Sequence, residues 1–213
     1  MIKKLRKNRG FTLIELMIVV AIVGILAVLA IFGVSKYLAN AKSAEATNTI
    51  GKINERAVAG YEEENNTAEI ALIGSTGQAS THALCGTAGP VPDQIAKVQN
   101  KKYQPDPTNL KDYATGSNVG IDTATRFGWK CLKFEMSQPQ YYIYGYAIGG
   151  NRAVPLVAVN AVPPVGAQGW LSEATGDLDA DNIQSVFSTG GQIEPGSKKP
   201  VTFTQINVFE AEE

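Results

Sequence analysis

The chain has 213 residues and a formal net charge of −1, with only 18% charged residues. So small an imbalance carries no signal of a nucleic-acid partner. The 21 glycines and 10 prolines favour a loop-rich, partly β domain over an all-helical one.

The N-terminus combines a basic leader with a long apolar run. Residues 1–10 hold five basic side chains and no acid, and residues 11–34 carry a single charge, Glu15. An apolar run of that length is a candidate transmembrane helix. Because basic flanks stay on the cytoplasmic side, the bulk of the chain is expected outside the membrane.

Glu15 is the unusual residue of this run. A carboxylate at the bilayer centre costs ~2.5–3.5 kcal/mol on insertion scales, so it needs a partner. A secretory signal is cleaved after its apolar stretch, whereas the small residue Gly10 precedes it. Cleavage after Gly10 would create a charged amine on Phe11, ~6 Å along a helix from Glu15. The amine of this chain or of a neighbouring chain would then pair with Glu15.

The segment from Gly10 to Glu15, Gly-Phe-Thr-Leu-Ile-Glu, resembles the N-terminus of type IV prepilins. The resemblance implies cleavage after Gly10 by the prepilin peptidase and N-methylation of Phe11. It also implies assembly into a helical fibre, in which Glu15 pairs with the terminal amine of an adjacent subunit. An ordinary single-pass anchor is the alternative, but it does not explain why the one charge lies one turn past a plausible cleavage site.

The expected function is therefore structural and not enzymatic: the major subunit of a type IV pilus, a retractable surface fibre used for motility and adhesion. The implied partners are further copies of the chain, the prepilin peptidase, the assembly platform and minor pilins. The precursor is expected in the inner membrane and the assembled subunit in a cell-surface pilus. A pseudopilin of a type II secretion system, which shares this N-terminus, is the alternative.

The helix is expected to run without a proline from Phe11 to about Glu63. This divides the chain into a leader (1–10), an apolar half-helix (11–34), an amphipathic half-helix (35–63) and a globular domain (64–213). Relatives often carry a proline at the position of Phe32, and their helix can unwind near it in the fibre. Phe32 keeps its backbone N–H, which argues against unwinding here, whereas Gly24 and Gly33 bracket a stretch that could still extend. The apolar stripe expected to hold the helix to the globular domain comprises Tyr37, Leu38, Ala41, Ala44, Ile50, Ile53, Ala57 and Tyr61.

The globular domain opens with a long connection, residues 65–124, rich in Gly, Pro, Thr, Asn and Ser, with a short helix expected at 91–99. Alternating or β-branched runs then predict four strands, at 126–136, 141–148, 154–162 and 201–209. Together these elements predict an α+β fold: a long N-terminal helix packed on an antiparallel sheet of about four strands, as in the pilin fold.

Two cysteines, Cys85 and Cys131, lie in the part of the chain expected outside the cytoplasm. No CxxC spacing exists, and the lone histidine, His82, cannot complete a usual zinc set. Cysteines in such a compartment most often pair, which predicts a Cys85–Cys131 disulfide contributing ~3–4 kcal/mol. Two buried free thiols are the alternative.

Alternating carboxylates at Asp177, Asp179 and Asp181 resemble the start of a calcium loop. The match is partial, because Asn182 stands where glycine is usual and Ser188 where a bidentate glutamate is usual. The alternative is a solvated turn whose aspartates cap nearby amides. Calcium is the one cofactor that the sequence suggests.

Four tyrosines gather at Tyr141, Tyr142, Tyr144 and Tyr146. An adhesive patch is one interpretation, but half-buried sheet residues are the more common outcome for such a run. No GxSxG, Walker or dinucleotide motif occurs. We therefore expect no catalytic residues.

Overall fold

The computed structural model describes residues 10–63, 82–106, 108, 111–116, 126–149 and 168–209. The chain divides into two compact units, residues 1–41 and residues 42–213. We call the second unit, residues 42–213, the head. The predicted strand at 154–162 lies outside the described residues.

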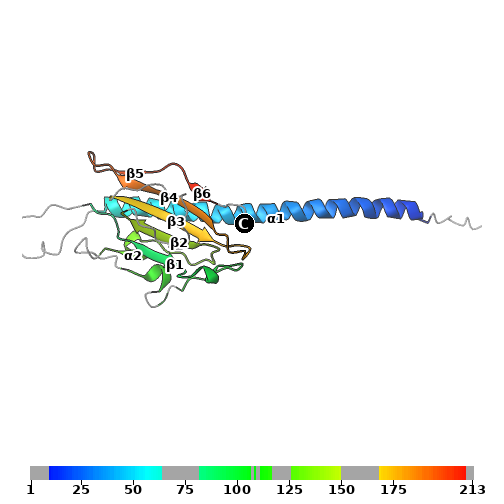
Figure 1. Cartoon of the computed structure of the whole chain (residues 1–213), viewed down its shortest axis with the longest axis horizontal. Coiled ribbons are helices and arrows are strands. Elements are labelled where there is room, and N and C mark those ends of the chain that lie inside the picture. Colours follow the sequence, from blue (N-terminus) through cyan, green and yellow to red (C-terminus); the bar gives the residue numbers. More distant parts are fainter. Residues whose placement is uncertain are drawn as a thin grey trace, which may run out of the picture. The chain divides into compact units, whose positions relative to one another are not determined.

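One helix, α1 (Leu13–Glu62), matches the predicted N-terminal helix closely (Figure 1). It contains no proline, and it is helical throughout the stretch between Gly24 and Gly33. Every side chain from residue 10 to residue 38 is exposed. In the first unit no described residue of α1 is buried.

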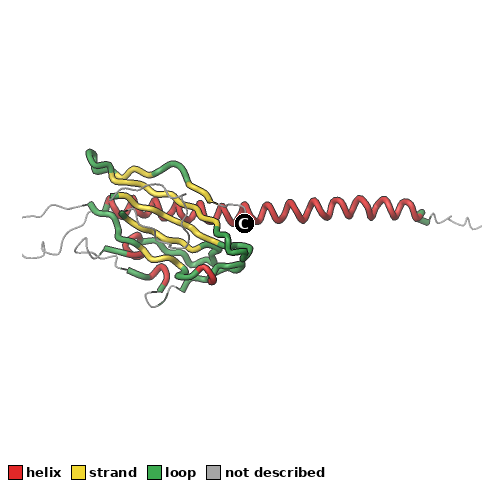
Figure 2. Tube along the Cα trace, viewed as in Figure 1, coloured by secondary structure: helices red, strands yellow, loops and turns green. Residues whose placement is uncertain are grey.

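The head contains an antiparallel sheet of six described strands, more than the four predicted (Figure 2). The strand order is β1-β2-β3-β4-β5, and β6 also pairs with β4. Both outer strands of that order are short and contain a proline, Pro90 in β1 and Pro200 in β5. The strands are β1 (Ala88–Val91), β2 (Ile143–Ile148), β3 (Gly169–Gly176), β4 (Ser185–Ile193), β5 (Pro200–Thr202) and β6 (Asn207–Phe209).

The second half of α1 packs on one face of this sheet and forms the core of the head. Tyr144, Ala174 and Phe187 lie side by side across β2, β3 and β4, and all three belong to the buried cluster that includes Ile50 and Ile53 of α1. Trp170 of β3, fully buried, donates its indole N–H to the Asn54 side chain of α1. Burial of this apolar surface, at roughly 25 cal/mol per Å², holds the helix segment to the sheet.

The predicted stripe on α1 is half right. Ile50, Ile53, Ala57 and Tyr61 are buried as expected, whereas Tyr37, Leu38, Ala41 and Ala44 are exposed. The buried face begins instead at Ala46. Periodicity located the face of the helix but could not show where the sheet that covers it begins.

The strand predicted at 126–136 is wrong. The segment forms a short helix, α2 (Gly128–Leu132), whose start needs the positive φ of 75° at Gly128. Lys133 ends the helix in the left-handed conformation, with φ of 51°. Trp129 and Leu132, one helical turn apart, are both buried. The apparent alternation in the sequence was therefore a short helical pattern.

Other boundaries also differ from the predictions. The helix predicted at 91–99 is a single 3₁₀ turn, η2 (Ile95–Lys97), and the last predicted strand is two strands, β5 and β6. A second 3₁₀ turn, η3 (Asp112–Ala114), lies in the long connection. The central strands β3 and β4 were not predicted at all.

Candidate functional site: the N-terminal segment

The start of α1 is organised by a reciprocal contact between Thr12 and Glu15. The Glu15 carboxylate accepts hydrogen bonds from the backbone N–H and the hydroxyl of Thr12, both at 2.8 Å and both through Oε2. In return, the Glu15 backbone N–H donates to the Thr12 hydroxyl at 3.3 Å. This is a capping box, which satisfies N–H groups that a helix start leaves unpaired.

The contact leaves one oxygen of Glu15 available. No described residue hydrogen bonds to Oε1, and the Glu15 side chain is exposed. A carboxylate offers about four acceptor positions, so binding to Thr12 does not exhaust it. Thr12 thus holds the carboxylate in place at the helix start through Oε2 and leaves Oε1 without a partner among the described residues.

Sequence reasoning missed this role of Thr12. The pattern Thr-x-x-Glu immediately before an apolar run is a known signature of a helix start, and it was present at residues 12–15. The charge of Glu15 alone does not indicate this capping role. The structure places the two predicted processing residues, Gly10 and Phe11, before the first turn of α1, in exposed non-helical backbone.

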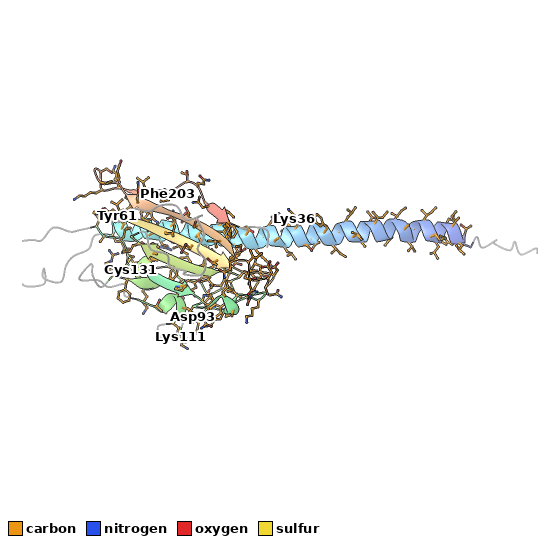
Figure 3. All side chains as sticks on the ribbon, in the orientation of Figure 1. Lys36, Tyr61, Asp93, Lys111, Cys131 and Phe203 are labelled. Atoms are coloured by element: carbon orange, nitrogen blue, oxygen red, sulfur yellow. A yellow bond between two sulfur atoms is a disulfide. The ribbon has the colours of Figure 1, made fainter. Side chains whose placement is uncertain are left out.

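The apolar half of α1 has the length and composition of a membrane span. Its most apolar 18-residue window has a mean hydropathy of 3.1, and none of that window is buried. Figure 3 shows its side chains projecting on all sides of the helix. A shallow apolar hollow around Gly24 is lined by Val20, Ala21, Ile25, Val28 and Leu29. Such a surface must be covered by lipid or by other apolar helices.

The two cysteines are joined in the structure, with an S–S distance of 2.02 Å between Cys85 and Cys131. The bond links the segment before β1 to α2. The buried Arg126 lies beside it and donates to the carbonyl oxygens of Gly60 and Ala83, at 3.0 and 3.2 Å. Burial lowers the pKa of the Arg126 guanidinium from its ordinary value. These contacts tie the last turn of α1 to the start of the sheet domain.

The three aspartates of the suggested calcium loop lie together, between β3 and β4. One carboxylate oxygen from each of Asp177, Asp179 and Asp181 falls within 4.8 Å of the others. Asn182 adopts a positive φ of 71°, so it takes the backbone conformation that glycine would supply. Ser188, however, lies inside β4 opposite Glu173 and is fully buried. The residue at the last ligand position therefore lies in the sheet, outside the turn.

Each of these carboxylates also caps a backbone amide. Asp177, Asp179 and Asp181 accept from the N–H groups of Ala180, Asp181 and Ile183, at 2.8, 3.2 and 2.7 Å. That is the geometry of the alternative interpretation, a self-capped turn. Calcium binding stays a prediction, and its test is whether chelation lowers the melting temperature of the protein.

The tyrosine run is part of the core. Tyr142, Tyr144 and Tyr146 are at most 1% exposed, and only Tyr141 is half-buried, so these residues do not form an adhesive patch. Burial raises the pKa of Tyr144 and Tyr146 well above the ordinary value. The half-exposed arrangement expected for an alternating strand is also wrong, because α1 covers the sheet there.

His82 lies against the end of α1 with Nδ1 3.1 Å from the Tyr61 carbonyl oxygen. No described carboxylate and nucleophile join it in a catalytic arrangement. The support for the prediction that the chain is not an enzyme therefore comes from the N-terminal segment, and the head adds none.

Comparison with known families bears on this same segment. Residues 5–33 match the family described as the prokaryotic N-terminal methylation motif. This motif is the leader signature of type IV pilins and pseudopilins, and it confirms the resemblance identified in the sequence. No curated protein and no solved structure matches the chain significantly. The long N-terminal helix packed on an antiparallel sheet gives the chain a pilin-like α+β architecture.

The motif therefore indicates a structural subunit of the pilin or pseudopilin type. It also implies processing by a prepilin peptidase and assembly within a pilus or secretion machinery.

Proposed function

We propose that the chain is the major subunit of a type IV pilus, made as a membrane-anchored precursor and polymerised through the apolar half of α1. The observation that carries the proposal is Glu15, a single acid at the start of an exposed apolar helix, whose Oε1 has no hydrogen-bond partner among the described residues. An acid in that position is costly in lipid unless a cation meets it. The amine of a cleaved neighbouring subunit is such a cation.

Processing would occur at Gly10, in exposed backbone before the helix begins. Hydrolysis of the peptide bond after Gly10 frees the amine of Phe11, which is then N-methylated. A Gly10→Leu variant should stay full length, whereas wild-type protein should begin at methylated Phe11. The mass of the N-terminal peptide measures both, and a variant of mature length would contradict the proposed cleavage site.

Assembly would move each apolar helix from lipid into a bundle of like helices. Lipid and bundle are similarly apolar, so packing and the charge pair must supply the specificity. Two unit charges ~4 Å apart at an effective dielectric of ~20 attract by ~4 kcal/mol before desolvation is subtracted. That is enough to select a register and small enough to leave the fibre reversible, as retraction would require.

The decisive test is filament yield in Glu15→Ala cells. We expect processing close to normal and almost no filaments by electron microscopy. A Thr12→Val variant, which removes the hydroxyl that orients Glu15 and keeps the carboxylate, should reduce filament yield less severely. Normal yield in Glu15→Ala cells would contradict the pairing role.

The further parts of the proposal follow from pilus function. The partners would be the assembly platform, minor pilins and other copies of the chain, and the assembled fibre would serve surface motility and adhesion. Deletion of the coding sequence should abolish surface filaments and movement over surfaces, and re-expression of the wild-type chain should restore both.

A type II secretion pseudopilin is the second candidate. The clustered carboxylates at Asp177, Asp179 and Asp181 favour it mildly. The size of the head and the Cys85–Cys131 bond favour the pilus. Immunogold labelling decides between them: long labelled surface fibres support the pilus, whereas loss of protein export in a deletion strain without such fibres supports the pseudopilin.

A further inference from the structure

Two lysines from distant parts of the chain meet at one aromatic ring of the head. Lys42 of α1 places Nζ 5.1 Å from the centroid of the Tyr141 ring, and Lys102 places Nζ 4.6 Å from it. The two cations are therefore at most ~10 Å apart, one Debye length at 0.1 M salt. We call Lys42, Lys102 and Tyr141 the lysine–tyrosine cluster.

The backbone fixes this arrangement. Tyr103 and Gln140 exchange two hydrogen bonds, each backbone N–H donating to the other's carbonyl oxygen at 2.8 Å. This bridge sets Lys102 beside Tyr141. The Tyr141 backbone N–H donates to the Glu45 carboxylate of α1 at 2.9 Å, which brings in the helix turn that carries Lys42. Both lysines are thus placed by the fold, independently of their attraction to the ring.

Within the described part of the head, neither lysine of the cluster forms an ion pair with a carboxylate. Among the described residues the lysine ion pairs are Lys97–Asp93, Lys111–Asp106 and Lys133–Glu63, and none includes Lys42 or Lys102. The Glu45 carboxylate accepts from the Tyr141 N–H and the Tyr144 hydroxyl, both through Oε1, so one carboxylate of α1 stands beside the two lysines. The turn that holds Asp177, Asp179 and Asp181 borders the cluster through Asn100. The Asn100 N–H donates to the Asp177 carbonyl oxygen at 3.2 Å. The three carboxylates cap backbone amides of the turn itself.

The sequence places this cluster close to any membrane that holds the apolar helix. Lys42 follows Leu38, the last exposed large apolar residue of α1, by four residues. These residues are helical, so four of them rise only ~6 Å along the axis. The headgroup layer adds ~5–8 Å to each side of the hydrocarbon core. Lysine side chains therefore reach that layer, and a half-buried tyrosine suits it, because tyrosine is enriched at membrane interfaces.

We propose that the lysine–tyrosine cluster binds the phosphates of anionic phospholipids on the outer face of the membrane that anchors the chain. The inference rests on the proposed membrane anchorage. The cluster would hold the head against the bilayer surface before assembly, and incorporation into a fibre would require its release. Each basic side chain near an anionic surface strengthens such binding by roughly fivefold at moderate salt.

The test uses the full chain reconstituted in phosphatidylcholine vesicles, with or without one quarter phosphatidylglycerol. Lysine acetylation is followed by mass spectrometry. In the anionic vesicles Lys42 and Lys102 should react at least about threefold more slowly. Lys199, which follows the carbonyl group that accepts from Tyr61 at the far end of α1, should not change. Half-molar salt should remove the difference, and equal labelling in both vesicles would overturn the proposal.

Variants supply a second measurement. Hydrogen exchange in residues 99–103 should be slower in anionic vesicles for wild-type protein and for the control K198Q/K199Q. The backbone of that control pair meets the hydroxyl of Tyr61, which lies ~28 Å along the helix axis from Lys42. The difference should vanish in K42Q/K102Q. A persistent difference in K42Q/K102Q would overturn the assignment.

Two further experiments ask whether the bound phosphate belongs to a lipid and whether the chain is anchored in the membrane. If soluble glycerol phosphate or a DNA oligonucleotide protects Lys42 and Lys102 equally in phosphatidylcholine vesicles, the cluster is a general anion site and the membrane assignment fails. Flotation separates this result from failure of the proposed function. A chain that floats without protection contradicts only the cluster, whereas a chain that does not float contradicts the anchorage and the cluster together.

Discussion

The two halves of α1 carry similar apolar residues in opposite surroundings. Ile22 in the first half is 52% exposed, whereas Ile53 in the second half is fully buried under the sheet. The helix is continuous between them, so the difference lies in the partner and not in the residue. The head supplies its own partner for Ile53. Ile22 has no such partner among the described residues, so the apolar half of α1 has the surface of a helix that lipid or other helices would cover.

The largest expected effect is a loss of head stability when the disulfide is removed, which tests the half of the comparison that supplies its own partner. Replacing both cysteines, Cys85→Ser and Cys131→Ser, should destabilise the head by about 4 kcal/mol, because the bond closes a loop of 46 residues. Both tryptophans lie in the head, so their fluorescence during urea unfolding reports on it alone. An unchanged midpoint would show that the sheet and α1 hold together without the bond.

The next prediction compares the same substitution in the two halves of α1. Ile53→Ala should cost about 3 kcal/mol of head stability, because it leaves a cavity between helix and sheet. Ile22→Ala should change head stability by less than about 0.5 kcal/mol. Urea unfolding of the full chain in detergent measures both. Similar losses in the two variants would break the distinction between the halves.

A smaller effect is expected from the polar contact between helix and sheet. Asn54→Ala leaves the buried N–H of Trp170 without its acceptor, which should cost about 2 kcal/mol. Asn48→Ala removes an exposed side chain six residues earlier and serves as the matched control. If the two variants unfold alike, Trp170 has found another acceptor or a water.

The smallest predicted effect is a pH dependence within the head. Burial and the hydrogen bond to Asp112 raise the pKa of Tyr103 to about 12, from an ordinary value of 10. The folded state therefore holds this proton more tightly than the unfolded state. Tyr103 should stabilise the head below pH 10 and lose that contribution as the pH rises toward 12. The difference in unfolding free energy between wild type and Tyr103→Phe should shrink over that interval; a constant difference would argue against the shift.

The sequence predicted the helix and the assembly segment because both depend on local properties. A long apolar run, a single acid and the residue Gly10 keep their meaning without any knowledge of the tertiary structure. Thr12 was recoverable by the same kind of reasoning, since its partner lies three residues away. These features also carry the functional signal, which is why function was easier to infer than the arrangement of the sheet.

The central strands were missed because their sequences look unlike strands. β3 and β4 contain Ser172, Glu173 and Ser188, all fully buried, so no alternation of polar and apolar residues marks a covered face. β4 also contains Gly190 and Gly191, which read as a turn. A side chain at Gly191 would meet the Trp170 ring at 2.4 Å, so the glycine makes room for a tryptophan on the neighbouring strand. Such a requirement exists only once the strands are paired.

The prolines at the two sides of the sheet have a consequence for crowding. Pro90 in β1 and Pro200 in β5 each remove a backbone donor from an outer strand only three or four residues long. Short strands with a proline are poor templates for a strand from another molecule, and β6, which also borders β4, is only three residues long. In a filament, neighbouring heads would therefore stay separately folded. Their sheets would not pair edge to edge into one irreversible sheet that runs across molecules.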